Sequence, residues 1–255
     1  MKRIFLLAAF ASVGLFTQAL SATVIGSLNV ANCAGGGVSV TATTITFLPV
    51  GTAANTGCIN TGIGTLLTYG TGGADTLNPA AVGNIMDLVL NVTPGTGFMT
   101  FASQPGQNGT TLSFTLVALG PGVTTNVGAA GCATATAGAV GTSCSVTGTS
   151  PFILTNAGGG QTGITLDASG TITDPTAAGG VSTWAGAFTT QLNLTPTQVY
   201  NDICSSPACT SGGTITSTDS AQFSLTTTPE PGTIGMMLSG GLLLAVSLLK
   251  RKGKV

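Results

Sequence analysis

Short runs in which apolar and polar residues alternate recur along this chain, separated by clusters of Gly, Pro, Asn and Ser. Alternation with a period of two is typical of a β-strand with one buried face. It is clearest in TTLSFTLVALGPG, where one face carries Leu112, Phe114, Leu116 and Ala118. The preceding segment GFMTFAS is separated from it by Gly, Pro and Asn residues that favour a turn. The two segments therefore predict a hairpin.

Eight further segments have the composition of strands and are bounded by turn residues. They are TVIGSLNV, VSVTATTITFLPV, TLLTYG, NIMDLVLNV, PFILT, TGITLDASGTIT, VSTWAGAFTTQLNL and GTITSTDSAQFSLTTT. In VSTWAGAFTTQLNL, one face carries Trp184, Phe188, Leu192 and Leu194. A face with this much aromatic and aliphatic area predicts a large share of the core.

About ten strands within residues 23–228 predict an all-β domain, an antiparallel two-sheet sandwich of jelly-roll type. The alternative is two Ig-like sandwiches in tandem. No Pro- or Ser-rich linker divides the chain near its middle, and no fixed repeat period is present, so one domain is favoured. The Gly- and Thr-rich tracts 120–150 and 155–163 predict long loops.

One short helix is predicted near 195–203, in the segment TPTQVYNDI. Thr195 suits the N-cap and Pro196 the first helical position. Val199 and Ile203 then lie four residues apart on one face. The composition otherwise opposes helices, since Thr is the commonest residue at 45, Gly follows at 39, and charged residues are 5% of the chain.

The N-terminus has the three parts of a secretory signal: Lys2 and Arg3, an apolar run from Ile4 to Phe16, and then the small residues of TQALSA. We expect residues 1–22 to be a signal peptide. Residues 23–228 then form an exported domain.

Six cysteines in an exported chain predict a set of disulfides. Nearest-neighbour pairing gives Cys33 with Cys58, Cys132 with Cys144, and Cys204 with Cys209, one of the 15 connectivities that six cysteines allow. Zinc binding and redox catalysis are disfavoured, because the chain has no His and no C-x-x-C. No cofactor is expected.

The C-terminal segment combines a Pro-rich motif, an apolar run and a basic tail. Pro229, Glu230 and Pro231 keep the backbone extended, and the uncharged residues 233–249 span about 25 Å as a helix, close to the thickness of a bilayer core. The basic cluster KRKGK follows and favours the cytoplasmic side. The segment therefore predicts a transmembrane helix at 233–249 with the domain outside.

This order of features resembles the PEP-CTERM sorting segment of exported bacterial proteins. The resemblance covers residues 229–255. It implies that Pro229, Glu230 and Pro231 are the recognition tripeptide and that Lys250, Arg251 and Lys252 are the stop signal. It further implies processing by exosortase, a membrane protease-transpeptidase, and a link to extracellular polysaccharide and biofilm matrix. The alternative is a plain C-terminal anchor, in which the prolines only end the last strand.

Catalysis and nucleic-acid binding are disfavoured by the charges of the domain. No Lys, Arg or His occurs between Ile4 and Leu249, so Ser-His-Asp, Cys-His and Ser-Lys pairings cannot form. The domain has six acids, Asp75, Asp87, Asp167, Asp174, Asp202 and Asp219. A surface that is only acidic repels phosphate backbones.

Three kinds of site remain open for the aspartates and aromatic residues. A glycoside hydrolase needs two carboxylates facing each other across a sugar. Asp167 and Asp174, in LDASGTITDP, form a weak candidate for Ca²⁺, with turn hydrogen bonds as the alternative. Trp184, Tyr69 or Tyr200 would serve a carbohydrate-binding module as stacking faces, with core packing as the alternative for Trp184. Asp87 interrupts the apolar run IMDLVLNV and is either exposed at an edge or paired inside.

Taken together, these patterns predict a non-enzymatic protein. We expect a membrane-anchored precursor that moves to the cell surface or the extracellular matrix. Its expected partners are an exosortase-type enzyme, the membrane before processing, and extracellular polysaccharide.

Overall fold

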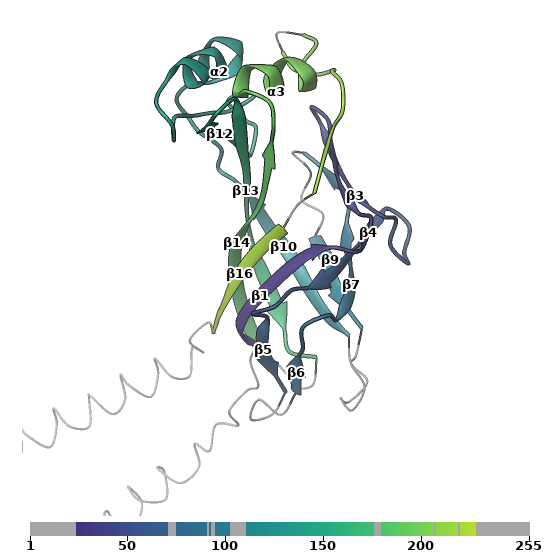
Figure 1. Ribbon diagram of the computed structural model, residues 1–255. Coiled ribbons are helices and arrows are strands. Elements are labelled where there is room, and N and C mark those ends of the chain that lie inside the picture. The colour runs from purple at the N-terminus through teal and green to yellow at the C-terminus, as the bar shows by residue number, and fades with distance from the viewer. Residues whose placement is uncertain are drawn as a thin grey trace, which may run out of the picture. The chain divides into compact units, whose positions relative to one another are not determined.

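β-Strands make up most of the computed structural model, which describes residues 24–70, 75–90, 92, 95–102, 111–175, 180–206, 208–218 and 220–227 (Figure 1). The strands are β1 (Ile25–Asn32), β2 (Gly37–Val40), β3 (Thr44–Leu48), β4 (Thr56–Thr61), β5 (Leu66–Tyr69), β6 (Asp75–Leu77), β7 (Val82–Met86), β8 (Leu88–Val89), β9 (Gly95–Phe101), β10 (Leu112–Leu119), β11 (Ser143–Cys144), β12 (Phe152–Gly158), β13 (Gln161–Thr173), β14 (Val181–Leu192), β15 (Ile215–Ser217) and β16 (Ser220–Thr227). The helices are α2 (Gly128–Ala137) and α3 (Pro196–Ile203).

Eight strands close into an antiparallel barrel. The order around it is β10-β9-β7-β4-β1-β16-β14-β13, and β13 pairs with β10 again to complete the ring. Closure depends on the length of β13, which has 13 residues. Its first half pairs with β12, from Phe152↔Leu166 to Gly158↔Gln161, and its second half pairs with β10.

The predicted all-β class is confirmed, but the predicted two-sheet sandwich is replaced by this barrel. Alternation shows that a strand has one buried face, and it does not say whether that face meets a second sheet or the inside of its own sheet. The tandem Ig-like alternative fails as well, because β1 near the start of the domain pairs with β16 near its end, from Gly26↔Leu225 to Ala31↔Ser220.

Two smaller groups of strands add to the barrel. A four-stranded antiparallel sheet has the order β15-β2-β3-β8. The hairpin of β5 and β6 continues the barrel at one end, where β5 pairs with β1. We call this end the base of the barrel; it also contains the end of β13 and the start of β14, as Figure 1 shows.

Aromatic side chains fill the barrel. Trp184 on β14 is 1% exposed, stacks on Phe98 with ring centroids 6.0 Å apart, and meets Phe223 edge-on at 5.3 Å. Its indole Nε1 donates a hydrogen bond to the carbonyl of Thr171 at 3.2 Å, so the one polar atom of the ring has a partner. Trp184 is therefore a core residue.

The period-two predictions hold for the strands around this core, with two exceptions. Trp184, Phe188 and Leu192 share the buried face of β14, whereas Leu194 lies beyond the strand and is half-buried. The predicted hairpin of β9 and β10 is confirmed, and its turn lies outside the described residues. Ala118 is exposed, because the register of β10 against β13 shifts between Leu116 and Ala118 and reverses the alternation there.

A second core lies under the two helices. α3 has the predicted start: Thr195 and Gln198 form a reciprocal capping box, and proline occupies the first turn. Val199, Tyr200 and Ile203 of α3 pack against the Cys132–Cys144 and Cys204–Cys209 disulfides.

All three disulfides have the predicted nearest-neighbour pairing. The Cα atoms of Cys33 and Cys58 are 5.5 Å apart, those of Cys132 and Cys144 5.2 Å, and those of Cys204 and Cys209 4.6 Å. These distances lie within the range of ordinary protein disulfides.

Both predicted long loops are wrong. Residues 120–150 contain α2 and β11, although α2 (GAAGCATATA) has neither an amphipathic pattern nor a side-chain N-cap. Its disulfide to β11 and its packing on α3 hold it. Residues 155–163 are the end of β12, the turn at Gly159 and Gly160, and the start of β13; Gly158, Gly159 and Gly160 have φ of 83°, 61° and 78°. Glycine adopts these positive φ values without steric cost.

The predicted signal peptide and the sorting segment lie outside the described residues, including Pro229, Glu230, Pro231, Lys250, Arg251 and Lys252. Within the described part of the chain, neither helix is long and apolar enough to cross a bilayer.

Candidate functional site

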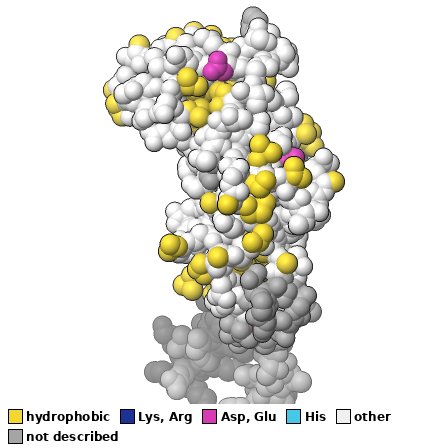
Figure 2. All heavy atoms as spheres, turned by 45° about the vertical axis from the view of Figure 1, so that its right-hand side comes forward, with side chains coloured by type: hydrophobic (Ala, Val, Ile, Leu, Met, Phe, Trp, Pro, Cys, Tyr) yellow, Lys and Arg dark blue, Asp and Glu magenta, His cyan; other side chains and the backbone are white. Residues whose placement is uncertain are grey.

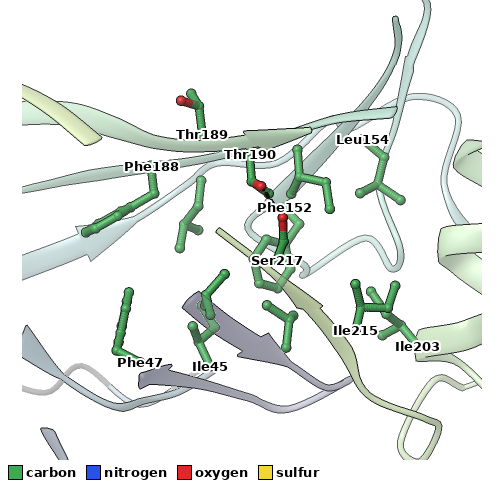
Figure 3. A pocket seen from close by; sticks show the side chains of 14 residues that line it. Ile45, Phe47, Phe152, Leu154, Phe188, Thr189, Thr190, Ile203, Ile215 and Ser217 are labelled. Atoms are coloured by element: carbon green, nitrogen blue, oxygen red, sulfur yellow. Dashed lines mark hydrogen bonds between the residues drawn. The ribbon is translucent and has the colours of Figure 1, made fainter. Parts of the chain in front are cut away.

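An apolar cavity lies between the four-stranded sheet and the strands β12, β13 and β14 (Figure 3). Phe47 and Ile45 face Phe188 and Phe152 across it, and Ile203 and Ile215 close one side. Thr190 and Ser217 supply hydroxyl groups that hydrogen-bond to each other. Its volume is about 40 Å³, enough for a few waters and far below the roughly 300–1,000 Å³ of ligand pockets. The cavity is a small void between packed strands and is too small for a binding site.

A larger hollow opens on the outer face of β14 and is lined by neutral polar groups. We call it the polar hollow; it measures about 550 Å³ and is lined by Ala157, Gly163, Thr189, Thr190, Gln191, Thr218 and Ser220. Gln191 donates to Gln161, and Gln161 donates to Asn193, each at 2.8 Å. Its groups donate and accept hydrogen bonds without carrying charge.

A second hollow of about 250 Å³ lies beside α3 and has a mixed lining, with apolar residues such as Leu90, Val146 and Phe152 beside several threonines. Thr41, Thr43, Thr147, Thr149 and Thr210 contribute hydroxyl groups to it. Figure 2 shows that the described surface on that side is mostly uncharged, with scattered hydrophobic side chains. The described surface in this view therefore offers few charged groups.

The aromatic residues do not form a surface for stacking on sugars. All ten that occur between residues 24 and 227 are buried. Trp184 and Tyr69 are each 1% exposed and Tyr200 is 6% exposed. The interpretation of these three residues as stacking faces is therefore wrong: strand alternation directs the first two into the barrel, and α3 turns Tyr200 onto the second core.

Asp167 and Asp174, the weak calcium pair, are not brought together. Asp167 lies on the outer side of β13, and Asp174 follows the end of that strand and is 1% exposed. Seven residues of extended chain separate them by about 23 Å. Among the described residues, no group of three or more His, Cys, Asp or Glu side chains is placed to hold a metal.

Of the other three aspartates, only Asp87 has a role that the structure describes. The carboxylate of Asp87 accepts a hydrogen bond from the backbone amide of Phe47 at 2.8 Å. This acid is half-buried and paired, and it ties β3 to the segment between β7 and β8. Asp202 is exposed on α3. Asp219 lies outside the described residues.

The acids that do share an environment are Asp75 and Asp174, at the base of the barrel. Asp75 is 7% exposed and lies opposite Tyr69 in the β5–β6 hairpin. The Oδ2 atom of Asp174 accepts a hydrogen bond from the backbone amide of Gly70 at 2.6 Å. This buried pair does not fit a glycoside hydrolase, whose carboxylates must flank an accessible sugar.

Asp75 and Asp174 both lie close enough to Tyr69 to affect its pKa. Burial of its hydroxyl raises its pKa above the ordinary value of 10.0, and the charges of Asp75 and Asp174 raise the pKa further. Sequence reasoning missed the Asp75–Asp174 pair, because 99 positions separate the two residues and no local motif contains both.

Comparison with known proteins adds no relative: no family model, curated protein or solved structure matches this chain.

Proposed function

We propose that this chain is a non-enzymatic exported bacterial protein, sorted through its C-terminal segment to the cell surface or the extracellular matrix. At that location the barrel has a structural or adhesive role. The observation that supports it best is the disulfide-linked barrel without a basic side chain. Its three disulfides are typical of chains that fold in an oxidising compartment.

The chemistry of the described residues supports a non-catalytic role. Proton transfer and covalent catalysis mostly use His, Lys, Cys or an accessible carboxylate pair. The domain has no His or Lys, its six cysteines are all in disulfides, and its two neighbouring acids are buried. Hydroxyl and amide groups dominate the polar hollow.

Replacing Pro229, Glu230 and Pro231 together by alanine tests the sorting step. In a bacterium with an exosortase, the wild-type protein should leave the membrane fraction and reach the surface, whereas the variant should stay membrane-anchored. Replacing Thr226, Thr227 and Thr228 by alanine is the matched control, because it changes three adjacent residues and keeps the tripeptide. Equal release of the wild type and the tripeptide variant would overturn the proposal.

A carbohydrate-binding module is the second candidate, and the polar hollow favours it. Its neutral donors and acceptors suit the hydroxyl groups of a polysaccharide, although it lacks an aromatic platform. Thr189→Val should weaken binding to the polysaccharide of the host, measured by calorimetry. Thr183→Val is the control, since this threonine lies on the same strand, six residues away, and also hydrogen-bonds to β16. Absence of binding by the wild type would remove this candidate.

A further inference from the structure

Asp75 points into the molecule at the base of the barrel. In the β5–β6 hairpin it lies directly opposite Tyr69, and residues opposite each other in an antiparallel pair present their side chains on the same face. Leu67 and Leu77, the next residues on that face, belong to the barrel core. The carboxylate of Asp75 is therefore held in the interior, with only 7% of the residue exposed.

Asp174 approaches the same place from β13. Its backbone amide donates to the carbonyl of Gly180, which continues the pairing of β13 with β14 for one more step. Its Oδ2 atom accepts a hydrogen bond from Gly70, the residue after Tyr69. The carboxylate of Asp174 thus connects the end of β13 to the hairpin that carries Asp75.

Ser182 brings a third side-chain oxygen to this end. It lies on the buried face of β14, opposite Ile172, and is fully buried. Because Asp174 lies opposite Gly180, Ser182 and Asp174 are diagonal neighbours on one face, about 7–8 Å apart at the backbone. The strand register alone places these two side chains together.

Two buried side-chain oxygens in the described residues have no hydrogen-bond partner, and both lie here: Oδ2 of Asp75 and Oγ of Ser182. Buried polar groups are normally hydrogen-bonded, and a buried carboxylate normally has a positive charge or hydrogen-bond donors beside it. No Lys, Arg or His occurs between Ile4 and Leu249. No residue from Ile4 to Leu249 can therefore supply a compensating positive charge.

We propose that Asp75 and Asp174, with the hydroxyl of Ser182, bind a Ca²⁺ ion at the base of the barrel. An all-oxygen set of ligands suits a hard cation. Ca²⁺ is favoured over Mg²⁺ because it accepts irregular geometry and more ligands, including backbone carbonyls. Two carboxylates predict modest affinity, with a Kd of about 10⁻⁴ to 10⁻³ M, as in extracellular modules. This site belongs to the folded barrel and does not depend on the proposed function.

Calcium binding is tested on the full chain in mild detergent, after removal of metal with EDTA. Calorimetric titration with CaCl₂ alone should show one ion per chain, and Ca²⁺ should raise the unfolding temperature. Asp75→Asn should raise the Kd by about tenfold or more, because one ligand charge is lost. Asp167→Asn is the matched control, since this acid lies on the outer side of β13; its Kd should equal that of the wild type.

A second readout, which does not need the Kd, compares the unfolding temperatures of the wild type and Asp75→Asn with and without Ca²⁺. Without metal, Asp75→Asn should unfold at a higher temperature than the wild type, because it removes an uncompensated buried charge. With saturating Ca²⁺, the order should reverse. Absence of Ca²⁺ binding in the wild type, or equal binding by Asp75→Asn, would overturn the proposal.

Discussion

At the scale of single residues, Gly170 controls how closely β13 approaches β10. A Cβ atom at this position would lie 1.9 Å from the carbonyl oxygen of Thr115 on β10 and 2.7 Å from the ring of Trp184. Neither the neighbouring backbone nor the packed indole has room to move. Gly170 therefore allows the contact that closes the barrel.

Gly170→Ala should lower the free energy of unfolding by about 1–3 kcal/mol, the usual cost of overpacking a core. Urea unfolding followed by the fluorescence of Trp184 measures this. Gly163→Ala on the same strand is the control, because the nearest heavy atom to its Cβ would be 4.0 Å away; its stability should change by less than about 0.5 kcal/mol. Equal effects of the two substitutions would contradict the close contact at Gly170.

Tyr69 gives the molecule a predictable response to alkaline pH. Its folded-state pKa is above 10.0, because of burial and the charges of Asp75 and Asp174. Below pH 10 the hydroxyl is protonated in both states, so Tyr69 adds no pH dependence there. Above pH 10 the unfolded chain ionises first, so stability falls until the folded pKa is passed.

Tyr69→Phe should remove part of this alkaline loss. Urea midpoints measured on both sides of pH 10 should fall more steeply for the wild type than for the variant. If both proteins lose stability in parallel, Tyr69 is not the group that titrates.

Residue roles set by nearby sequence were predictable, and roles set by strand pairing were not. Thr195 and Pro196 indicate the start of α3, because the capping residues lie within the four positions from Thr195 to Gln198. The sequence pattern predicts Asp174 as a candidate ligand together with Asp167, its neighbour in sequence. In the structure, Asp174 instead shares the surroundings of Tyr69 with Asp75, through the β5–β6 hairpin and the end of β13, and no local sequence pattern contains this arrangement.

At the scale of elements, the disulfides cross-link segments over sequence separations of very different length. Cys33–Cys58 joins the chain after β1 to β4 across 25 positions, and Cys204–Cys209 closes a turn of 5 positions after α3. In the chain-entropy description, a longer closed loop restricts the unfolded state more. The two disulfides should therefore differ in how much they stabilise.

Replacing Cys33 and Cys58 by alanine should lower the free energy of unfolding by about 3.5 kcal/mol, and replacing Cys204 and Cys209 by about 2 kcal/mol. Urea unfolding of the two double variants measures the difference. A larger loss from the shorter loop would show that packing in the second core, and not loop length, determines the contribution.

The two helices show what sequence patterns detect at this scale. α3 has a capping box and an apolar face, and it was predicted with its correct position. α2 has Gly, Ala and Thr around its whole circumference, so it carries no amphipathic signal. It is held by long-range contacts: the Cys132–Cys144 disulfide and the hydroxyl of Thr197, which donates to the carbonyl of Cys132.

At the scale of the whole molecule, barrel closure depends on one strand pairing with two partners along its length. The C-terminal half of β13 meets β10, about 50 positions earlier in the chain. Period-two alternation predicts the strands and their buried faces in either a sandwich or a barrel. The choice between them is made by this pairing, and sequence alternation does not contain it.

The charged residues are distributed unevenly between the domain and the two ends of the sequence. Six aspartates and no basic residue lie between residues 23 and 228, and the basic side chains are confined to the two ends of the sequence. If both ends are removed during export and sorting, the protein that reaches the surface has no basic side chain. The mass of the surface protein therefore shows whether both ends, and with them all basic side chains, have been removed.

The intact mass of the protein recovered from the cell surface, measured without reduction, tests export, sorting and disulfide formation together. We predict a chain that begins between Leu20 and Thr23 and ends near Pro231, lighter by the six hydrogens that three disulfides remove. A surface protein that keeps Lys250 to Val255, or one whose cysteines are reduced, would contradict it.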